Sequence, residues 1–469
     1  MNDARPEKNP IYWFYGSASV AFGIKNNAFS YLLLIYSTQV LGIPGYLAAL
    51  ALAVAMAWDA VSDLFLGHWS DKTQSRMGRR HPFMYAGFIM LPLSFYALFN
   101  PVIELTEANS WGYLLVTAIL IRTAVTLVEV PSVALLPDLV KDYDERNKWL
   151  VLRHAFGWYG GNGIHVINMA FWVGAFGVAS QAGYSIYGLA GALIIAASIL
   201  ISSLGTQKVA AAMPQPSEPF RFREIWYEIK QIAQSVKNAN FFWLFVYSLV
   251  VGAAGGMSTA LYLYNVTYFF AFTGPQIAIT GVFVFASPAV AYFLAPALGK
   301  ALGKKQAAVA ALLGAIFLYP IPYLLTLAGY WPESGSWNSL IFYSIFVMTE
   351  VIGFIVGGVM LDSMMADVVE DSEVQTSRRS EGLFYAARSF ASKAVSALGI
   401  ILAGSIVSLV GMDGIKGVAD MTDVMRGDLA SFFLPAYCGL YFLAIYLISK
   451  YKIDRKQHQT NLEALAKKQ

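Results

Sequence analysis

The feature that most constrains this chain is a series of long apolar runs separated by short polar connections. A helix needs roughly 20 apolar residues to cross the hydrocarbon core of a bilayer, and irregular backbone cannot face lipid. The sequence therefore predicts an all-α membrane protein with about 12 transmembrane helices. These predicted helices lie near 12–41, 45–68, 83–100, 112–137, 149–176, 183–205, 240–272, 276–302, 306–329, 338–365, 382–411 and 429–450.

Composition supports a membrane protein and excludes several other classes. Of the 469 residues, 57% are hydrophobic and 13% are charged, whereas ordinary globular domains carry about 25% charged residues. The net charge of +3 is small and scattered, so no nucleic-acid partner is expected. The single cysteine, Cys438, cannot form an internal disulfide. The polar start "MNDARPEKNP" does not resemble a signal peptide, so the first apolar run is predicted to be retained.

Loop charges predict the orientation of the chain in the membrane. Basic residues follow the second apolar run, and Lys304 and Lys305 follow the eighth. Loops predicted on the other side are short and acidic or neutral, as at Glu104 and Glu107. Because lysine and arginine are enriched in cytoplasmic loops, both termini are predicted to lie in the cytoplasm, with the protein in the cell (inner) membrane.

The longest internal polar stretch divides the apolar runs into six and six. The predicted organisation is an N-terminal six-helix bundle (1–205), a cytoplasmic linker with an amphipathic helix (206–238), a C-terminal six-helix bundle (239–450) and a cytoplasmic tail (451–469). The halves also share a pattern, since "LPDLVKDYDE" and "MADVVEDSEV" align Asp138 with Asp367. Repeated bundles with a binding site near the bilayer midplane are typical of secondary transporters.

Two acidic residues lie inside the second apolar run, where uncharged residues would be expected. Asp59 and Asp63 are four residues apart and therefore share one face of a helix. A charged residue at the centre of a membrane helix costs about 2.5–3.5 kcal/mol on insertion scales, and such residues usually serve function. Two neighbouring carboxylates can bind a cation or share a proton. The alternative is that they pair with a buried arginine and only join helices.

The segment "WDAVSDLFLGHWSDKTQSRMGRRHPF" resembles a region of a known transporter family. It is similar to helix 2 and the following cytoplasmic loop of the glycoside–pentoside–hexuronide:cation symporters, which are melibiose permease-like members of the major facilitator superfamily. Three further stretches agree: "EVPSVALLPDLVKDYDER", "LRHAFGWYGG" and "MMADVVEDSE…RRSEGLFYAARSFASKAVSALG". The resemblance implies the major facilitator fold and secondary active transport.

The resemblance also implies particular site residues. The implied cation site consists of Asp59, Ser62, Asp63 and Thr126, with Ser62 in place of the family's asparagine. The substrate-site hypothesis combines the implied Glu129, Arg153 and Lys393 with Lys25 and Asn26 of the first helix. The predicted gating residues of the cytoplasmic motif are Gly67, Asp71, Arg76, Gly78, Arg79, Arg80, Asp138 and Asp367.

Two substitutions leave the substrate open. The family's sugar-binding aspartate is replaced by Asn26 or Asn27, and an aromatic residue that stacks on the sugar is replaced by Val133. Galactoside recognition is therefore not implied, and a symporter of amphiphilic, lysolipid-like molecules stays an alternative. Glu350 and Asp362 have no clear counterpart in the family, so proton handling, gating and pairing are all open for them.

The sequence as a whole predicts cation-coupled symport of a sugar or glycoside by alternating access. The coupling ion is Na+ or H+, no cofactor or further metal is expected, and the partners are the solute, the cation and the lipid bilayer around a monomer. A polytopic membrane enzyme is the rival class, but no nucleophile, metal or nucleotide motif occurs at diagnostic spacing. A receptor without transport is a further alternative.

Overall fold

The computed structural model describes residues 9–140, 142–213, 238–376 and 397–466. Regular structure in these ranges is helical throughout, as predicted. The described helices fall into two compact units, each treated separately below. The first unit comprises Met1–Ile225 with the short segments Thr273–Gly281 and Met412–Asp420, and the second comprises the remainder of the chain.

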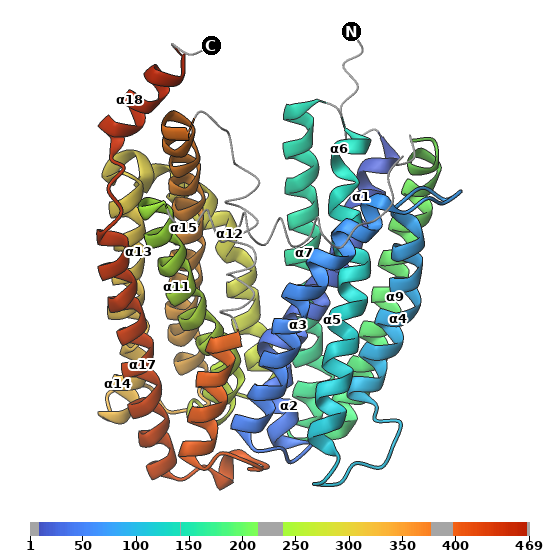
Figure 1. Cartoon of the computed structure of the whole chain (residues 1–469). Coiled ribbons are helices and arrows are strands. Elements are labelled where there is room, and N and C mark those ends of the chain that lie inside the picture. The colour runs from blue at the N-terminus through green and yellow to red at the C-terminus, as the bar shows by residue number, and fades with distance from the viewer. Residues whose placement is uncertain (1–8, 141, 214–237, 377–396, 467–469) are drawn as a thin grey trace. The chain divides into compact units, whose positions relative to one another are not determined.

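The first unit is a bundle of long helices that run side by side (Figure 1). In it α1 packs against α7 and α9, α4 packs against α9 and α5, and α3 packs against α5. The helices are α1 (Pro10–Asn27), a π-helical turn (Ala28–Leu32), α2 (Leu33–Gln39), α3 (Gly45–Lys72), α4 (His81–Phe99), α5 (Ser110–Ala134), α6 (Leu136–Leu139), α7 (Tyr143–Phe171), α8 (Val173–Phe176) and α9 (Gln181–Ala211).

The second unit is a bundle of the same kind. In it α13 packs against α15, and α17 packs against α11 and α13. The helices are α11 (Ala239–Tyr264), a π-helical turn (Asn265–Phe269), α12 (Gly274–Leu302), α13 (Lys304–Leu318), α14 (Ile321–Leu327), α15 (Trp337–Thr376), Ala397–Val410, α17 (Asp423–Ser449) and α18 (Arg455–Ala466). Most of α12 belongs to this unit.

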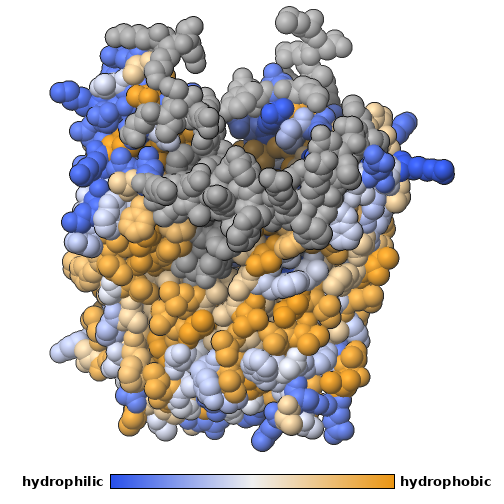
Figure 2. Space-filling model, in the orientation of Figure 1, coloured by the Kyte–Doolittle hydropathy of each residue, from blue (hydrophilic) through white to orange (hydrophobic). Residues whose placement is uncertain are grey.

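Each of the predicted apolar runs has a helical counterpart. Within the described ranges, nine helices are long and apolar enough to cross a membrane. The three other runs correspond to Pro10–Gln39, α7 and the described part of the eleventh helix, Ala397–Val410. Figure 2 shows apolar side chains gathered over the middle of the helices, with hydrophilic residues towards the helix ends. This distribution fits helices that cross a bilayer.

Two predicted helix boundaries were wrong. α7 begins at Tyr143 rather than near residue 149, because the Asp142 side chain accepts a hydrogen bond from the Glu145 N–H and caps the helix. The acidic segment 367–373 was predicted as a loop but lies within α15. No glycine or proline interrupts the chain between Asp362 and Thr376, so nothing stops the helix at the end of the apolar run.

The glycine-rich segment "GWYGGNG" allows α7 to pack closely against α1. A Cβ on Gly23 of α1 would lie 2.0 Å from the carbonyl oxygen of Gly157. A Cβ on Gly161 would lie 2.5 Å from the carbonyl oxygen of Gly23. Only glycine permits this backbone approach, which brings α1 and α7 together around Arg153. Most of the predicted amphipathic linker, residues 214–237, lies outside the described residues.

Candidate functional site

Three of the four predicted cation-site residues meet where α3 packs against α5. Asp59 and Ser62 come from α3, and Thr126 comes from α5. The Thr126 hydroxyl is 3.4 Å from Asp59 Oδ1 and 3.2 Å from Ser62 Oγ. All three side chains are buried. Their carboxylate and hydroxyl oxygens form a cluster of the kind that hard cations prefer.

An arginine lies beside this cluster. Arg122 is on α5, one turn before Thr126, and its Nη1 is 3.5 Å from Asp59 Oδ2. Both side chains are almost fully enclosed, with 7% and 3% of their surfaces exposed. The guanidinium also lies 4.3 Å from the centre of the Phe29 ring. The buried arginine partner considered as the alternative to a cation site is therefore present next to the oxygen cluster.

The other acids of this region also lie near Arg122. Asp63 and Glu129 are both half-buried and interact electrostatically with the guanidinium. Asp59 forms the ion pair with Arg122 described above and has the strongest of the three electrostatic interactions with it. Arg122 therefore has three candidate acidic partners, and a shift of its side chain would exchange one for another.

The predicted substrate residue Arg153 occupies an aromatic environment on α7. Its guanidinium carbon lies 5.0 Å from the centre of the Phe22 ring and 5.5 Å from that of Tyr15, both on α1. The side chain is buried, yet Nη1 and Nη2 make no hydrogen bond within the described part of the chain. Buried donors of this kind usually have a partner. Arg153 therefore holds donors that an oxygen-rich ligand could satisfy.

Further polar atoms without hydrogen bonds lie on the same two helices. Among the described residues they include Ser19 Oγ and Asn27 Oδ1 on α1, and Trp158 Nε1 on α7. These atoms offer both donors and acceptors. Of the remaining predicted residues, Lys25 is buried and Asn26 is exposed. Lys393 lies outside the described residues.

The predicted cytoplasmic motif forms an ion-pair network in the first unit. Arg79 and Arg80 both pair with Asp138 Oδ2, and Arg80 also reaches Asp71 Oδ1 at 3.0 Å. Arg80 additionally donates to the Ala134 carbonyl oxygen. These contacts tie the α3–α4 loop to the end of α5 and to α6.

The glycines and the remaining arginine of this motif have different roles. Gly78 has a left-handed φ of +89°, and a Cβ there would lie 2.8 Å from the Ala210 carbonyl oxygen. Glycine is therefore required at this turn. Gly67 meets the side chain of Val130 at an ordinary contact distance, and Arg76 is exposed.

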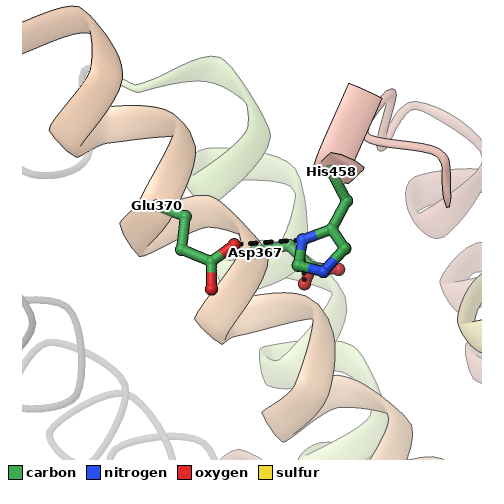
Figure 3. A group of neighbouring side chains, drawn as sticks. All are labelled: Asp367, Glu370 and His458. Atoms are coloured by element: carbon green, nitrogen blue, oxygen red, sulfur yellow. Dashed lines mark ion pairs between the residues drawn. The ribbon is translucent and has the colours of Figure 1, made fainter. Parts of the chain in front are cut away.

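Asp367 is at the centre of a second network, in the second unit. Lys304 Nζ donates to both of its oxygens, at 2.6 and 2.8 Å. Figure 3 shows Asp367 and Glu370 of α15 facing His458 of α18, whose Nδ1 is 3.2 Å from Asp367 and 3.0 Å from Glu370. Burial and the negative charge of Asp367 raise the pKa of the neighbouring Tyr451.

This second network also has the composition of a metal site. One ligand atom from each of Asp367, Glu370 and His458 lies within 4.8 Å of the others. However, the Lys304 ammonium group already contacts both oxygens of Asp367. A metal ion at this carboxylate would meet that positive charge. The geometry therefore favours an ion-pair network that docks α18 on α15.

Sequence reasoning missed several residues of these sites. Arg122 was not assigned to the cation site, although it lies four residues before Thr126 on the same face. His458 and Tyr451 fall within the segment predicted as a cytoplasmic tail. No local signal in the sequence indicates which helix the tail contacts.

The fold and the buried charges within its helices define a polytopic membrane transporter. The chain belongs to the family described as MFS/sugar transport protein, whose model matches residues 14–455. Its family and its structural relatives are transporters and not enzymes.

Several characterised and uncharacterised transporters are similar to this chain. An uncharacterized symporter of Synechocystis is 35% identical, over 30% of this chain and 27% of that relative. The symporter YnaJ of Bacillus subtilis is 23% identical over 96% of this chain and 93% of its own length. The isoprimeverose transporter of Lactiplantibacillus pentosus is 23% identical over 96% of this chain and 90% of its own length.

Solved structures share the fold. A crystal structure of the nucleoside transporter NupG superposes with a TM-score of 0.65 at 14% identity, covering 95% of this chain and 100% of that one. The xylose transporter XylE from E. coli superposes with a TM-score of 0.61 at 13% identity, covering 95% and 99%. At these identities the likeness establishes the fold alone.

Proposed function

We propose that this protein is a secondary active transporter that couples a cation, Na+ or H+, to symport of a sugar or glycoside by alternating access. The observation that carries the proposal is the buried oxygen cluster of Asp59, Ser62 and Thr126 beside Arg122. Relatives named as a symporter, a lactose permease and an isoprimeverose transporter support this class of substrate. Two six-helix bundles that rock about a central site would provide alternating access.

Arg122 suggests how the cation site would work. A cation that binds Asp59 competes with the guanidinium for the carboxylate, because both are positive and the site is enclosed. Arg122 would then turn towards Asp63 and Glu129, with which it already interacts electrostatically. Because Glu129 is also a proposed substrate contact, this exchange would link cation binding to substrate binding. Such coupling is reciprocal by thermodynamic necessity.

The substrate is proposed to bind along α1 and α7. Arg153 and the other buried polar atoms on these helices offer hydrogen bonds to hydroxyl groups, and the Tyr15 and Phe22 rings offer apolar faces. Sugars present both kinds of surface, so they fit this environment. Lys25, Asn26 and Lys393 are proposed to complete the site, and both termini are proposed to face the cytoplasm of the cell (inner) membrane.

The cation site is tested by thermal unfolding of the purified protein in sodium chloride and in choline chloride at several pH values. A cation that binds the folded state at 100 times its Kd stabilises it by about 2.7 kcal/mol. We expect sodium to raise the Tm of the wild type and not that of Asp59→Asn. The control, Asp423→Asn, removes an exposed carboxylate and should keep the shift. No shift with sodium, combined with no pH-gradient-driven uptake, would contradict cation coupling.

The substrate class is tested by counterflow in proteoliposomes with lactose, isoprimeverose and a lysophospholipid. We expect a glycoside to exchange in the wild type and exchange to be strongly reduced in Arg153→Ala. The conservative variant Arg153→Lys keeps the charge but loses the planar fork of donors, so it should recover only part of the exchange. Exchange of the lysophospholipid alone would replace the sugar assignment with an amphiphilic substrate.

A further inference from the structure

The second unit contains a half-buried acid, Glu350, that no part of the proposed cation site explains. Glu350 lies on α15, thirteen residues after the helix begins at Trp337. At 1.5 Å per residue this places it roughly 20 Å along the helix axis, well inside the apolar span. Asp367, at the far end of the same apolar helix, is seventeen residues further on, so the two acids are separate.

The groups around Glu350 are hydroxyls. Ser258 Oγ of α11 and the Tyr437 hydroxyl of α17 both donate towards Glu350 Oε1, at 3.3 and 3.2 Å. The described residues form no ion pair with Glu350, and no lysine, arginine or histidine among them contacts it. A carboxylate inside an apolar span without a cationic partner is disfavoured unless a proton or a cation neutralises it.

The hydroxyl network extends beyond the acid. Ser258 Oγ is also 3.3 Å from the Tyr319 hydroxyl, which is 3.4 Å from that of Tyr323. The Tyr319 and Tyr437 rings pack 4.8 Å apart. A serine hydroxyl has one hydrogen, so it can serve Glu350 or Tyr319 but not both at once. The donor and acceptor roles along this chain of hydroxyls can therefore be exchanged when Glu350 gains or loses a proton.

The hydroxyls around Glu350 suit a carboxyl group that binds a proton. Ser258 and Tyr437 each lie within hydrogen-bonding distance of Oε1, which as a carboxyl oxygen accepts from both. With Oε1 accepting two hydrogen bonds, Oε2 is the atom left to take a proton, which converts the carboxylate to a neutral carboxyl group.

We propose that Glu350 is a proton-binding site in the second unit, separate from Asp59, with Ser258 and Tyr437 positioning its carboxyl group. Among the described residues, the other titratable groups that face it are tyrosines, namely Tyr343 of the same helix and Tyr319, Tyr437 and Tyr441. The site requires neither substrate nor a cation at Asp59. Proton binding at Glu350 can therefore be tested, and confirmed or contradicted, without knowing whether the proposed symport occurs.

The test is infrared difference spectroscopy of the purified full-length protein during a pH titration. The wild type should show the carbonyl stretch of a protonated carboxyl group at pH values where exposed carboxylates are ionised. We expect this band to be absent in Glu350→Gln and retained in Glu333→Gln, which alters an exposed acid between α14 and α15. The same band in wild type and Glu350→Gln would overturn the proposal.

Two further measurements keep the test decisive. Tyr437→Phe retains the acid but removes one donor, so the band should move to higher frequency. An unchanged frequency would contradict the assignment, even if Glu350→Gln failed to fold. Replacing choline chloride with sodium chloride should leave the band in place, because the site is assigned to a proton. Loss of the band in sodium would identify a sodium site instead and overturn the proton assignment.

Discussion

Asp59 in the first unit and Glu350 in the second both lie within membrane-spanning helices, but the two acids are surrounded differently. The Asp59 carboxylate in the first unit has a guanidinium at 3.5 Å and accepts a hydrogen bond from the Thr126 hydroxyl. Glu350 in the second unit has two hydroxyl donors and, among the described residues, no positive partner. The difference separates two ways of keeping a carboxyl group in an apolar interior, which are pairing with a fixed charge and neutralisation by a bound proton.

The largest expected effect comes from removing the fixed charge. Arg122→Leu leaves the buried Asp59 without its ion-pair partner, and breaking a buried pair in this way destabilises proteins by about 3–5 kcal/mol. The double variant Arg122→Leu/Asp59→Asn should recover most of this loss because no charge is left unpaired. Unfolding in denaturant measures both. If Arg122→Leu is as stable as the wild type, Asp59 is not charged. The proposed difference in charge between Asp59 and Glu350 would then be wrong.

An intermediate effect is expected in the ion-pair networks around Asp138 in the first unit and Asp367 in the second. Arg80 is 7% exposed and reaches Asp71, Asp138 and a carbonyl oxygen, so Arg80→Ala should cost about 2–3 kcal/mol. Lys304 is 35% exposed, and its partner Asp367 keeps contacts from His458 and Tyr451. Lys304→Ala should therefore cost about 1 kcal/mol. Equal losses of unfolding free energy in the two variants would show that the other contacts of Asp367 do not compensate for the loss of Lys304.

The smallest effect concerns the hydroxyls. Thr126→Val and Tyr437→Phe each remove one donor to a buried acid, and a typical hydrogen bond contributes about 1 kcal/mol, with more for bonds to charged groups. If Asp59 is ionised and Glu350 is neutral, Thr126→Val should be the more destabilising of the two. Measuring both by thermal unfolding at neutral pH and at acidic pH checks this. A reversed order at neutral pH would contradict the assignment of charges.

Much of the fold was predictable, because the length of each apolar run is dictated by bilayer thickness. The twelve predicted runs all have helical counterparts, and the six-and-six division follows from the single long polar stretch. The boundaries that failed are informative. The end of α15 was predicted too early because the apolar run ends near residue 365. The helix continues to Thr376 because no residue in this segment interrupts its backbone hydrogen bonding.

The cation site was predictable in part. The spacing of Asp59 and Asp63, and the resemblance of the surrounding segment to a transporter family, led to Asp59, Ser62 and Thr126, which the structure brings together. Arg122 was not assigned as the partner of Asp59 because the sequence of one helix does not indicate which face of another helix packs against it. The hydroxyl environment of Glu350 could not be predicted for the same reason. The spacing shows only that Tyr319 and Tyr323 share one helical face and that Tyr437 and Tyr441 share another.

The sequence by itself therefore determined that this is a helical membrane protein, where its spans lie and which ionisable groups must be hidden from lipid. These properties depend on local hydrophobicity and spacing along single helices. Only the tertiary structure decided that Asp59 meets an arginine while Glu350 meets hydroxyls. The reason is physical, since the partner of a buried charge is chosen by how helices distant in sequence pack, and that choice decides whether the charge persists.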